Sequence, residues 1–249
     1  MMSILEKITE GIEYPFLIEF LNEPSKRIRT RLASLYIKAA GEDLNEAIYT
    51  ILAAGEIIHN ASLLHDDVID EAKQRRGKTT IGKSLSYKMS IVAGDYLISK
   101  AMSKILDLKN QEILEIFQKC TQLMCEGEIS QYFSRGNIPS VDEYITICKN
   151  KTGMLFSAIL ESCAVIIGID RKRAKEFGQL FGIYFQIKND LNEESALADK
   201  KNNIYTANSV LGIENTISLL DNYREEMRNL LGVFPESNYK QELEGLFKE

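Results

Sequence analysis

Three aspartates at one end of an apolar run are the strongest chemical signal in the sequence: Asp66, Asp67 and Asp70. On a helix, Asp66 and Asp70 would project from the same face, with Asp67 about 100° around the axis. Carboxylates this close repel one another unless a cation lies between them. Magnesium takes oxygen ligands and commonly bridges one or two carboxylates to substrate phosphates. The spacing therefore suits a magnesium site, but acidic triplets are common, and on spacing alone a solvated acidic helix end is favoured over a metal site.

Basic residues lie on both sides of this acidic cluster. Arg75 and Arg76 follow it within a few residues, and Lys26, Arg27 and Arg29 lie upstream. Arginine matches phosphate oxygens with two parallel hydrogen bonds, and lysine adds a compact charge. Each basic run alone would be an ordinary surface feature. Acidic groups for a metal together with basic groups for phosphate favour a site that handles phosphate.

A second acidic candidate contains Asn189, Asp190 and Glu193. Asp190 and Glu193 are three residues apart and would share one face of a helix. If that helix ran antiparallel to the first across a cavity, the two clusters could clamp a diphosphate through metal ions, which act as Lewis acids. The alternative is the polar end of a buried helix, because Lys188 makes this segment less acidic than the first.

The elements that carry these residues read as helices. One long helix is predicted from an N-cap at Asp43 towards Asp66, and another from about residue 174 to 193, because apolar residues recur at three- and four-residue spacing. The apolar stretch Met154–Ile169 contains Glu161 and is predicted to be a buried helix too short to span a bilayer. The best predicted breaks are Pro24, Gly41, Pro139, Gly168–Asp170 and Gly232–Pro235.

Composition agrees with one helical domain over residues 1–249. The chain is 45% hydrophobic, enough for a substantial core, and it has only 4 prolines and no tryptophan. Alternating runs rich in Val and Thr, which would indicate strands, are few. The net charge of -6 argues against a nucleic-acid binder, which would present a basic surface. We therefore expect an all-α protein with no nucleic-acid partner.

The four cysteines show no metal-ligand spacing: Cys120, Cys125, Cys148 and Cys163. The N-terminus carries no secretory signal, so the plain expectation is reduced thiols in a cytoplasmic protein that is not an integral membrane protein.

Residues 56–101 resemble the first aspartate-rich region of the trans-polyprenyl diphosphate synthases, reading EIIHNASLLHDDVIDEAKQRRGKTT and then VAGDYLISKA. Further matches follow in the family's order: KRIR at 26–29, GEISQ at 127–131, KTGMLF at 151–156 and FQIKNDLNE at 185–193. The resemblance implies an antiparallel helical bundle around a central cavity, the isoprenoid synthase type I fold. It also implies a magnesium-dependent (Mg2+) prenyltransferase, usually a homodimer, that condenses isopentenyl diphosphate with an allylic diphosphate.

The resemblance also implies roles by position. Magnesium on the allylic diphosphate would be held by Asp66, Asp67 and Asp70, with Arg75 on the same diphosphate. The diphosphate of isopentenyl diphosphate would be bound by Lys26, Arg29, His59 and Arg76. The allylic site and its cationic transition state would be lined by Lys151, Thr152 and Gln186. A second metal cluster would comprise Asn189, Asp190 and Glu193. The residues implied to be catalytic are Asp66, Asp67, Asp70, Lys151 and Thr152.

The sequence departs from the family pattern in several places. The second cluster reads NDxxE in place of DDxxD, and Pro24-Ser25 stand where the family has glycines. The chain also looks shortened at the N-terminus and after about residue 206. These departures leave open a weakly active accessory subunit of a heteromeric synthase. A class I terpene cyclase is less favoured, because Glu193 and Leu197 stand where its motif needs serine and glutamate.

Product length is indicated by the residues one helical turn before the first aspartates. Ala61 and Ser62 are small, whereas large aromatic residues near this place in the family close the product tunnel early. The resemblance therefore implies a medium- or long-chain polyprenyl diphosphate, with more than three isoprene units.

Overall fold

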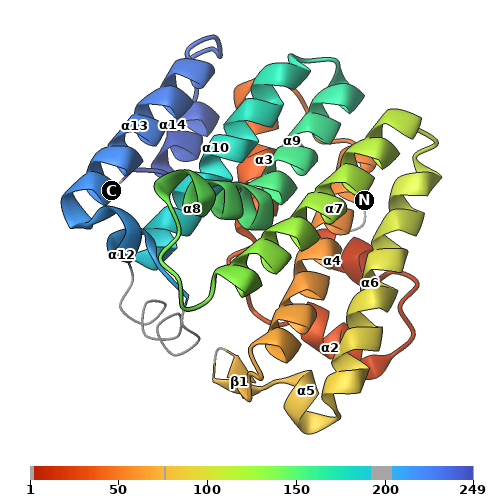
Figure 1. Cartoon of the computed structure of the whole chain (residues 1–249). Helices are drawn as coiled ribbons and strands as arrows, with labels where there is room; N and C mark the ends of the chain where they lie inside the picture. Colours follow the sequence, from red (N-terminus) through yellow and green to blue (C-terminus); the bar gives the residue numbers. More distant parts are fainter. Residues whose placement is uncertain (1–2, 76, 192–203, 249) are drawn as a thin grey trace. The chain divides into compact units, whose positions relative to one another are not determined.

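The computed structural model describes residues 3–75, 77–191 and 204–248. The described chain is built of helices, with one short antiparallel hairpin in which Gln74 pairs with Thr79, so the predicted all-α class is confirmed (Figure 1). The elements are α1 Ile4–Thr9, α2 Pro15–Leu21, α3 Ile28–Ala39, α4 Glu46–Ile69, β1 Gln74–Arg75, β2 Lys78–Thr79, α5 Ile81–Ser84, α6 Tyr87–Asp107, α7 Gln111–Ser134, α8 Val141–Cys148, the π-helix η1 Lys149–Gly153, α9 Met154–Ile167, α10 Arg171–Asp190, α12 Ala207–Leu211, α13 Ile213–Leu231 and α14 Asn238–Gly245.

The chain divides into two compact units. The first comprises residues 1–31 and 44–114, and the second comprises residues 32–43 and 115–249. The boundaries fall inside α3, between α3 and α4, and near the start of α7. The expectation of a single domain stays a prediction, and each unit is described by itself below.

In the first unit, α4 packs along α6 and against α1. Its N-cap is Asn45, whose side chain accepts a hydrogen bond from the Ile48 amide at 3.0 Å. The prediction that Asp43 caps this helix is wrong, because Asp43 forms an ion pair with Lys38 instead. The helix therefore begins slightly later than expected. Its apolar face is buried as the periodicity predicted, including Ile51 and Ile58.

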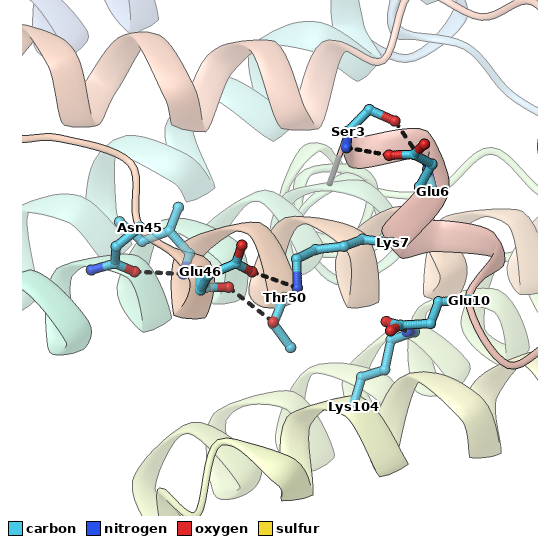
Figure 2. Close-up of polar contacts among 9 residues, drawn as sticks. Ser3, Glu6, Lys7, Glu10, Asn45, Glu46, Thr50 and Lys104 are labelled. Atoms are coloured by element: carbon cyan, nitrogen blue, oxygen red, sulfur yellow. Dashed lines mark hydrogen bonds and ion pairs between the residues drawn. The ribbon is translucent and has the colours of Figure 1, made fainter. Parts of the chain in front are cut away.

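Two ion pairs attach the N-terminal helix α1 to its neighbours (Figure 2). Lys7 lies 2.7 Å from Glu46 at the start of α4, and Glu10 at the end of α1 lies 3.1 Å from Lys104 on α6. Both lysine side chains are only 13% exposed. Their stems therefore pack against the unit while the charged ends meet carboxylates at its surface.

In the second unit, α10 packs along α9, η1 and α13. Asp170 caps α10 by accepting a hydrogen bond from the Arg173 amide at 3.0 Å, so this helix begins a few residues before the predicted start. Helix α9 ends at Gly168, whose φ of +73° is a left-handed conformation that glycine adopts without strain. The buried helix predicted at Met154–Ile169 is thus confirmed, with its end slightly earlier.

Among the residues that the structure describes, two helical stretches are long and apolar enough, by length and composition, to cross a membrane: Glu46–Ile69 and Val141–Ile167. The second is longer than the predicted apolar helix because α8, η1 and α9 follow one another without a break. Most of each apolar stretch is buried inside the protein, which is typical of core helices.

Candidate active site

The first acidic cluster lies at the end of α4. The helix ends at Ile69, and Asp70 is its C-cap. The Asp70 amide still donates to the Asp66 carbonyl at 2.9 Å, so the two aspartates stay one turn apart. Asp66 and Asp70 are half-buried, whereas Asp67 is only 2% exposed. The cluster therefore contains two accessible carboxylates and one buried carboxylate.

The buried Asp67 is neutralised by Arg75 on β1. Arg75 donates from Nε at 2.9 Å and approaches with Nη2 at 2.8 Å, both to Oδ1 of Asp67. Burial raises the pKa of Asp67, Arg75 acts in the opposite direction, and Asp70 and Glu23 add to the increase. The guanidinium is the group that keeps this buried carboxylate compatible with the ionised state.

The hairpin that carries Arg75 is tied to the end of α4. The Ala72 amide donates to the Asp67 carbonyl at 2.9 Å, and the Thr80 hydroxyl donates to the Ala72 carbonyl at 2.7 Å. Thr80 is buried, so both ends of the hairpin are fixed. This local framework places Arg75 beside the acidic cluster, while the predicted substrate residue Arg76 lies outside the described residues.

The basic segment before α3 is also fixed to α4, through the buried carboxylate of Glu56. Its Oε1 accepts from the Thr30 hydroxyl at 2.7 Å and from the Thr30 amide at 3.2 Å. Thr30 follows the predicted substrate residue Arg29, and His59 lies one helical turn after Glu56 on α4. Arg29 and His59 are half-buried, and Lys26 is exposed. Glu56 thus positions the segment that carries Arg29 against the helix that carries His59.

The accessible carboxylates suit a metal that is shared with a substrate. Within the described ranges, no three His, Cys, Asp or Glu side chains lie close enough together to hold a metal ion on their own. Magnesium does not need such a cage, because it retains waters and binds through one or two carboxylates together with phosphate oxygens. The oxygen donors of Asp66 and Asp70 fit that mode of binding.

The second unit contains a cavity of about 90 Å³ beside η1 and α10. Its lining includes four residues predicted for the site, Lys151, Thr152, Gln186 and Asp190. The first two belong to η1, where the helix widens by one residue per turn, a feature often found at functional sites. The structure thus brings together residues from two predicted motifs that lie far apart in the sequence.

A chain of hydrogen bonds joins these residues. The Thr152 hydroxyl donates to Oε1 of Gln186 at 2.9 Å, and Nε2 of Gln186 donates to Oδ1 of Asp190 at 2.9 Å. Oδ2 of Asp190 accepts from the Tyr144 hydroxyl at 2.5 Å and from the Ala207 amide at 3.1 Å. Burial raises the pKa of Asp190, and these three donors act in the opposite direction.

The rest of the second acidic cluster is less fully described. Asn189 is half-buried at the end of α10, whereas Asp190 is only 4% exposed. Glu193 lies outside the described residues. The two acidic clusters belong to different units, so the prediction that they clamp one diphosphate between them stays a prediction.

Two further residues in this part of the chain were not assigned from the sequence. Glu128 on α7 lies 2.5 Å from the Lys151 ammonium, and Tyr144 on α8 donates to Asp190. Glu128 belongs to the GEISQ segment, whose match to the family was the available signal. Nothing in the local pattern of Tyr144 distinguishes it from an ordinary core tyrosine, because its partner is 46 positions away.

Similarity to solved structures covers nearly the whole chain. The crystal structure of a decaprenyl diphosphate synthase from Rhodobacter capsulatus has a TM-score of 0.86 at 24% identity, over 98% of this chain and 91% of that chain. A geranyltranstransferase from Thermotoga maritima has a TM-score of 0.81 at 26% identity, over 98% and 96%. These similarities confirm the predicted isoprenoid synthase type I fold.

Sequence relatives indicate the same kind of protein as the solved structures. Octaprenyl diphosphate synthase from Escherichia coli is 33% identical over 201 residues, which is 78% of this chain but only 62% of the relative's length. A short chain isoprenyl diphosphate synthase from Methanocaldococcus jannaschii is 28% identical over 96% of this chain and 79% of its own length. Residues 14–207 match the model of the family described as polyprenyl synthetase, and this match covers both acidic clusters and their basic partners. The chain belongs to the polyprenyl synthetase family.

Proposed function

We propose that this chain is a magnesium-dependent prenyltransferase that condenses isopentenyl diphosphate with an allylic diphosphate. The observation that carries the proposal is the end of α4, where half-buried Asp66 and Asp70 flank Asp67 and its partner Arg75. Carboxylates for a metal beside guanidinium for phosphate are what a diphosphate site requires. The names of the relatives, octaprenyl and decaprenyl diphosphate synthase, support this reaction class.

The proposed reaction breaks the bond between the allylic carbon and the diphosphate oxygen. That carbon then bonds to the alkene of isopentenyl diphosphate, and a proton is lost to the released diphosphate. Magnesium, when bound, supplies positive charge to the leaving diphosphate. Asp66 and Asp70 would hold it together with the phosphate oxygens.

Arg75 can serve both Asp67 and a diphosphate. A guanidinium carries five N–H donors, and Asp67 occupies the one on Nε and one of the two on Nη2. The remaining donors are available to phosphate oxygens, so substrate binding does not require the buried carboxylate of Asp67 to lose its partner. Lys26, Arg29 and His59 remain the residues proposed for the diphosphate of isopentenyl diphosphate.

The cavity beside η1 is proposed to handle the allylic substrate and its developing positive charge. The Lys151 ammonium provides charge for phosphate, and the oxygen of Thr152 provides an electron-rich atom for a cation. Preorganised groups of this kind usually supply the largest part of enzymatic rate enhancement.

The proposed product is a medium- or long-chain polyprenyl diphosphate. Ala61 and Ser62, near the acidic end of α4, are small, which in this family would leave room for a growing chain. The named relatives range from short-chain to decaprenyl synthases, so the product length rests on these residues.

We also propose a homodimer. Helix α7 presents Ile129, Tyr132 and Phe133 to the surface, and Phe133 is 77% exposed. A row of large apolar side chains on one helix is typical of a surface that another protein covers. A second copy of the chain fits the assembly that the family resemblance implies. The proposed location is the cytoplasm, where the thiols of the free cysteines stay reduced.

A second candidate function is an accessory subunit that tunes another synthase. It is favoured by Asn189, which replaces a carboxylate in the second cluster, and by Asp190, whose two oxygens are both engaged by protein donors. A subunit of this kind would bind isopentenyl diphosphate but turn over only after a second synthase chain is added.

The deciding experiment is a magnesium-dependent assay with isopentenyl diphosphate and primers of two, three and four isoprene units, with products identified by mass spectrometry. A ladder of longer diphosphates establishes the synthase. The double variant Asp66→Asn/Asp70→Asn should lower turnover by about a hundredfold or more while keeping its helical content. Asp142→Asn, which removes an exposed carboxylate on α8, is the matched control and should retain full activity.

Well-folded protein that gives no product with any primer would exclude the synthase. Turnover that appears only with a second chain would support the accessory subunit. Near-normal activity in Asp66→Asn/Asp70→Asn would refute the metal assignment.

A further inference from the structure

Both carboxylate oxygens of Asp190 accept hydrogen bonds from donors of its own chain. Tyr144 and Ala207 donate to one carboxylate oxygen, and Gln186 donates to the other. The side chain is buried at the end of α10, and its donors come from α8, from α10 itself and from the start of α12. Both oxygens are engaged by protein donors, Oδ2 by two of them, and the side chain is only 4% exposed, so this carboxylate is poorly suited to the role of a metal ligand.

The carboxylate sets the direction of the whole chain of hydrogen bonds. An ionised carboxylate only accepts hydrogen bonds, so Gln186 must turn its NH2 group towards Asp190. Its carbonyl oxygen then faces Thr152, which can only respond by donating its hydroxyl hydrogen. The lone pairs of the Thr152 oxygen are left for other partners, and Thr152 lines the cavity.

We propose that Asp190 is a positioning residue that orients Gln186, and through it Thr152, instead of binding a second set of metal ions. The inference deepens the proposed function and rests on it for its kinetic consequences. With its hydrogen committed to Gln186, Thr152 offers only electron density to the cavity, which suits a substrate carbon that becomes positively charged. Asn189, at the place of a family carboxylate, is consistent with a cluster that no longer needs high charge for metal binding.

The substitution Asp190→Asn tests the direction of the chain. If the new amide oxygen keeps the hydrogen bonds from Tyr144 and Ala207, its NH2 group faces the NH2 group of Gln186. Gln186 must then flip, and its NH2 group points at Thr152, which reverses the Thr152 hydroxyl. We expect kcat to fall by about tenfold to a hundredfold, as for other misplaced catalytic groups, with the magnesium midpoint of turnover unchanged.

The double variant Gln186→Glu/Asp190→Asn restores the direction with the same net charge. The amide introduced at position 190 would donate to one oxygen of the new glutamate, and the other glutamate oxygen would accept from Thr152. The carbonyl oxygen of that amide keeps the hydrogen bonds from Tyr144 and Ala207. We expect kcat to recover from the Asp190→Asn value towards that of the parent protein, instead of falling by the product of the two single effects. Asp66→Asn serves as the reference for a metal ligand and should raise the magnesium midpoint, and the exposed Asp142→Asn should change neither quantity.

Thermal unfolding of the parent, Asp190→Asn, Gln186→Glu and the double variant gives a second readout that needs no activity. The proposal expects the double variant to melt closer to the parent than Asp190→Asn does. The proposal would be overturned if the double variant lost as much melting temperature as Asp190→Asn and Gln186→Glu lose together. A magnesium midpoint that rises in both Asp190→Asn and the double variant would also overturn it. If the parent gives no product, the proposed function fails, and the melting temperatures alone decide the role of Asp190.

Discussion

Ala61 and Ser62 are adjacent on α4, yet the room around them differs. Ala61 is completely buried, whereas Ser62 is half-buried and donates its hydroxyl to the His59 carbonyl at 2.8 Å. A large residue at Ala61 would overpack the core and cost about 1–3 kcal/mol. Ser62 is therefore the better position for a test of product length, because a side chain there can extend into partly open space.

We expect Ser62→Phe to shorten the product, because an aromatic ring next to the acidic end of α4 would obstruct a growing chain. Mass spectrometry of the products measures the change. Ser62→Ala removes the hydroxyl without adding bulk and should keep the parent product. An unchanged product in a folded Ser62→Phe protein would show that the chain does not grow past this residue.

The cysteines differ strongly in accessibility. Cys120, Cys148 and Cys163 are buried, and burial raises the pKa of Cys148 to about 12. Cys125 is exposed, although desolvation, followed by the charges of Glu126 and Glu128, raises the pKa of its thiol as well. Because the thiolate is the reactive form, even Cys125 should react slowly at neutral pH.

Native protein treated with iodoacetamide should therefore be labelled at Cys125 alone, as peptide mass spectrometry can show. Below the raised pKa of Cys125, the labelling rate should increase about tenfold for each pH unit, because the thiolate fraction does. Cys125→Ser should abolish native labelling. Rapid labelling that levels off near pH 7 would contradict the expected direction of the pKa shift.

Among the elements, α10 depends on glycine for its close approach to η1 and α9. A Cβ atom at Gly182 would lie 2.4 Å from the Gly153 Cα, and one at Gly178 would lie 2.7 Å from the Phe156 carbonyl oxygen. Both neighbours are backbone atoms, which cannot move without displacing the helix. The two glycines, one turn apart, therefore set the distance between α10 and the segment that carries Lys151 and Thr152.

Gly182→Ala should lower the free energy of unfolding by about 1–3 kcal/mol, because the added methyl group overpacks a backbone contact. Gly245→Ala is the matched control, since a Cβ there meets no atom within 4 Å. That control should change stability by less than about 1 kcal/mol. Urea denaturation of both variants measures the difference, and equal values would contradict the close approach.

The sequence predicts the helices better than it predicts which distant side chains contact one another. The long helices follow from spacing that is local, and every predicted break falls between observed helices. The predicted N-cap at Asp43 was wrong because Asn45, shortly after it, caps α4 instead. The Asp43 carboxylate forms an ion pair with Lys38. The bond between Tyr144 and Asp190 depends on packing of distant segments, and no local pattern reports it.

At the scale of the whole molecule, the resemblance was more informative than the composition. Composition indicated only a helical protein, whereas the ordered motifs identified the fold that the solved structures share. The individual site residues remain proposals, because neither motif order nor fold similarity shows which side chain binds which group. The buried state of Asp67 and Asp190 could not have been read from motifs that present them as equivalent to their accessible neighbours.

The proposed dimer leads to a test on intact protein. Phe133 on α7 is largely exposed, so its replacement should not disturb the core. Phe133→Ser should weaken self-association, measured by analytical ultracentrifugation as a higher dissociation constant, with helical content unchanged. Val233→Ser, which removes another exposed apolar side chain outside α7, is the control. A monomeric parent protein, or a Phe133→Ser variant that associates as tightly as the parent, would argue against this surface.

The π-helix η1 makes the chain from α8 to α9 tolerant of one particular deletion. The Met154 amide bonds to the Lys149 carbonyl, so this turn contains one residue more than an α-helical turn. Deleting Asn150 would let the turn close as an α-helical turn, and the helices on either side would keep nearly the same rotation about their axis. Tyr144 would then still face Asp190, whereas one residue removed from a regular α-helix rotates one side by about 100° relative to the other. The extra residue is thus a local adjustment of the segment that carries Lys151 and Thr152, and its loss should affect the cavity more than the packing of α8.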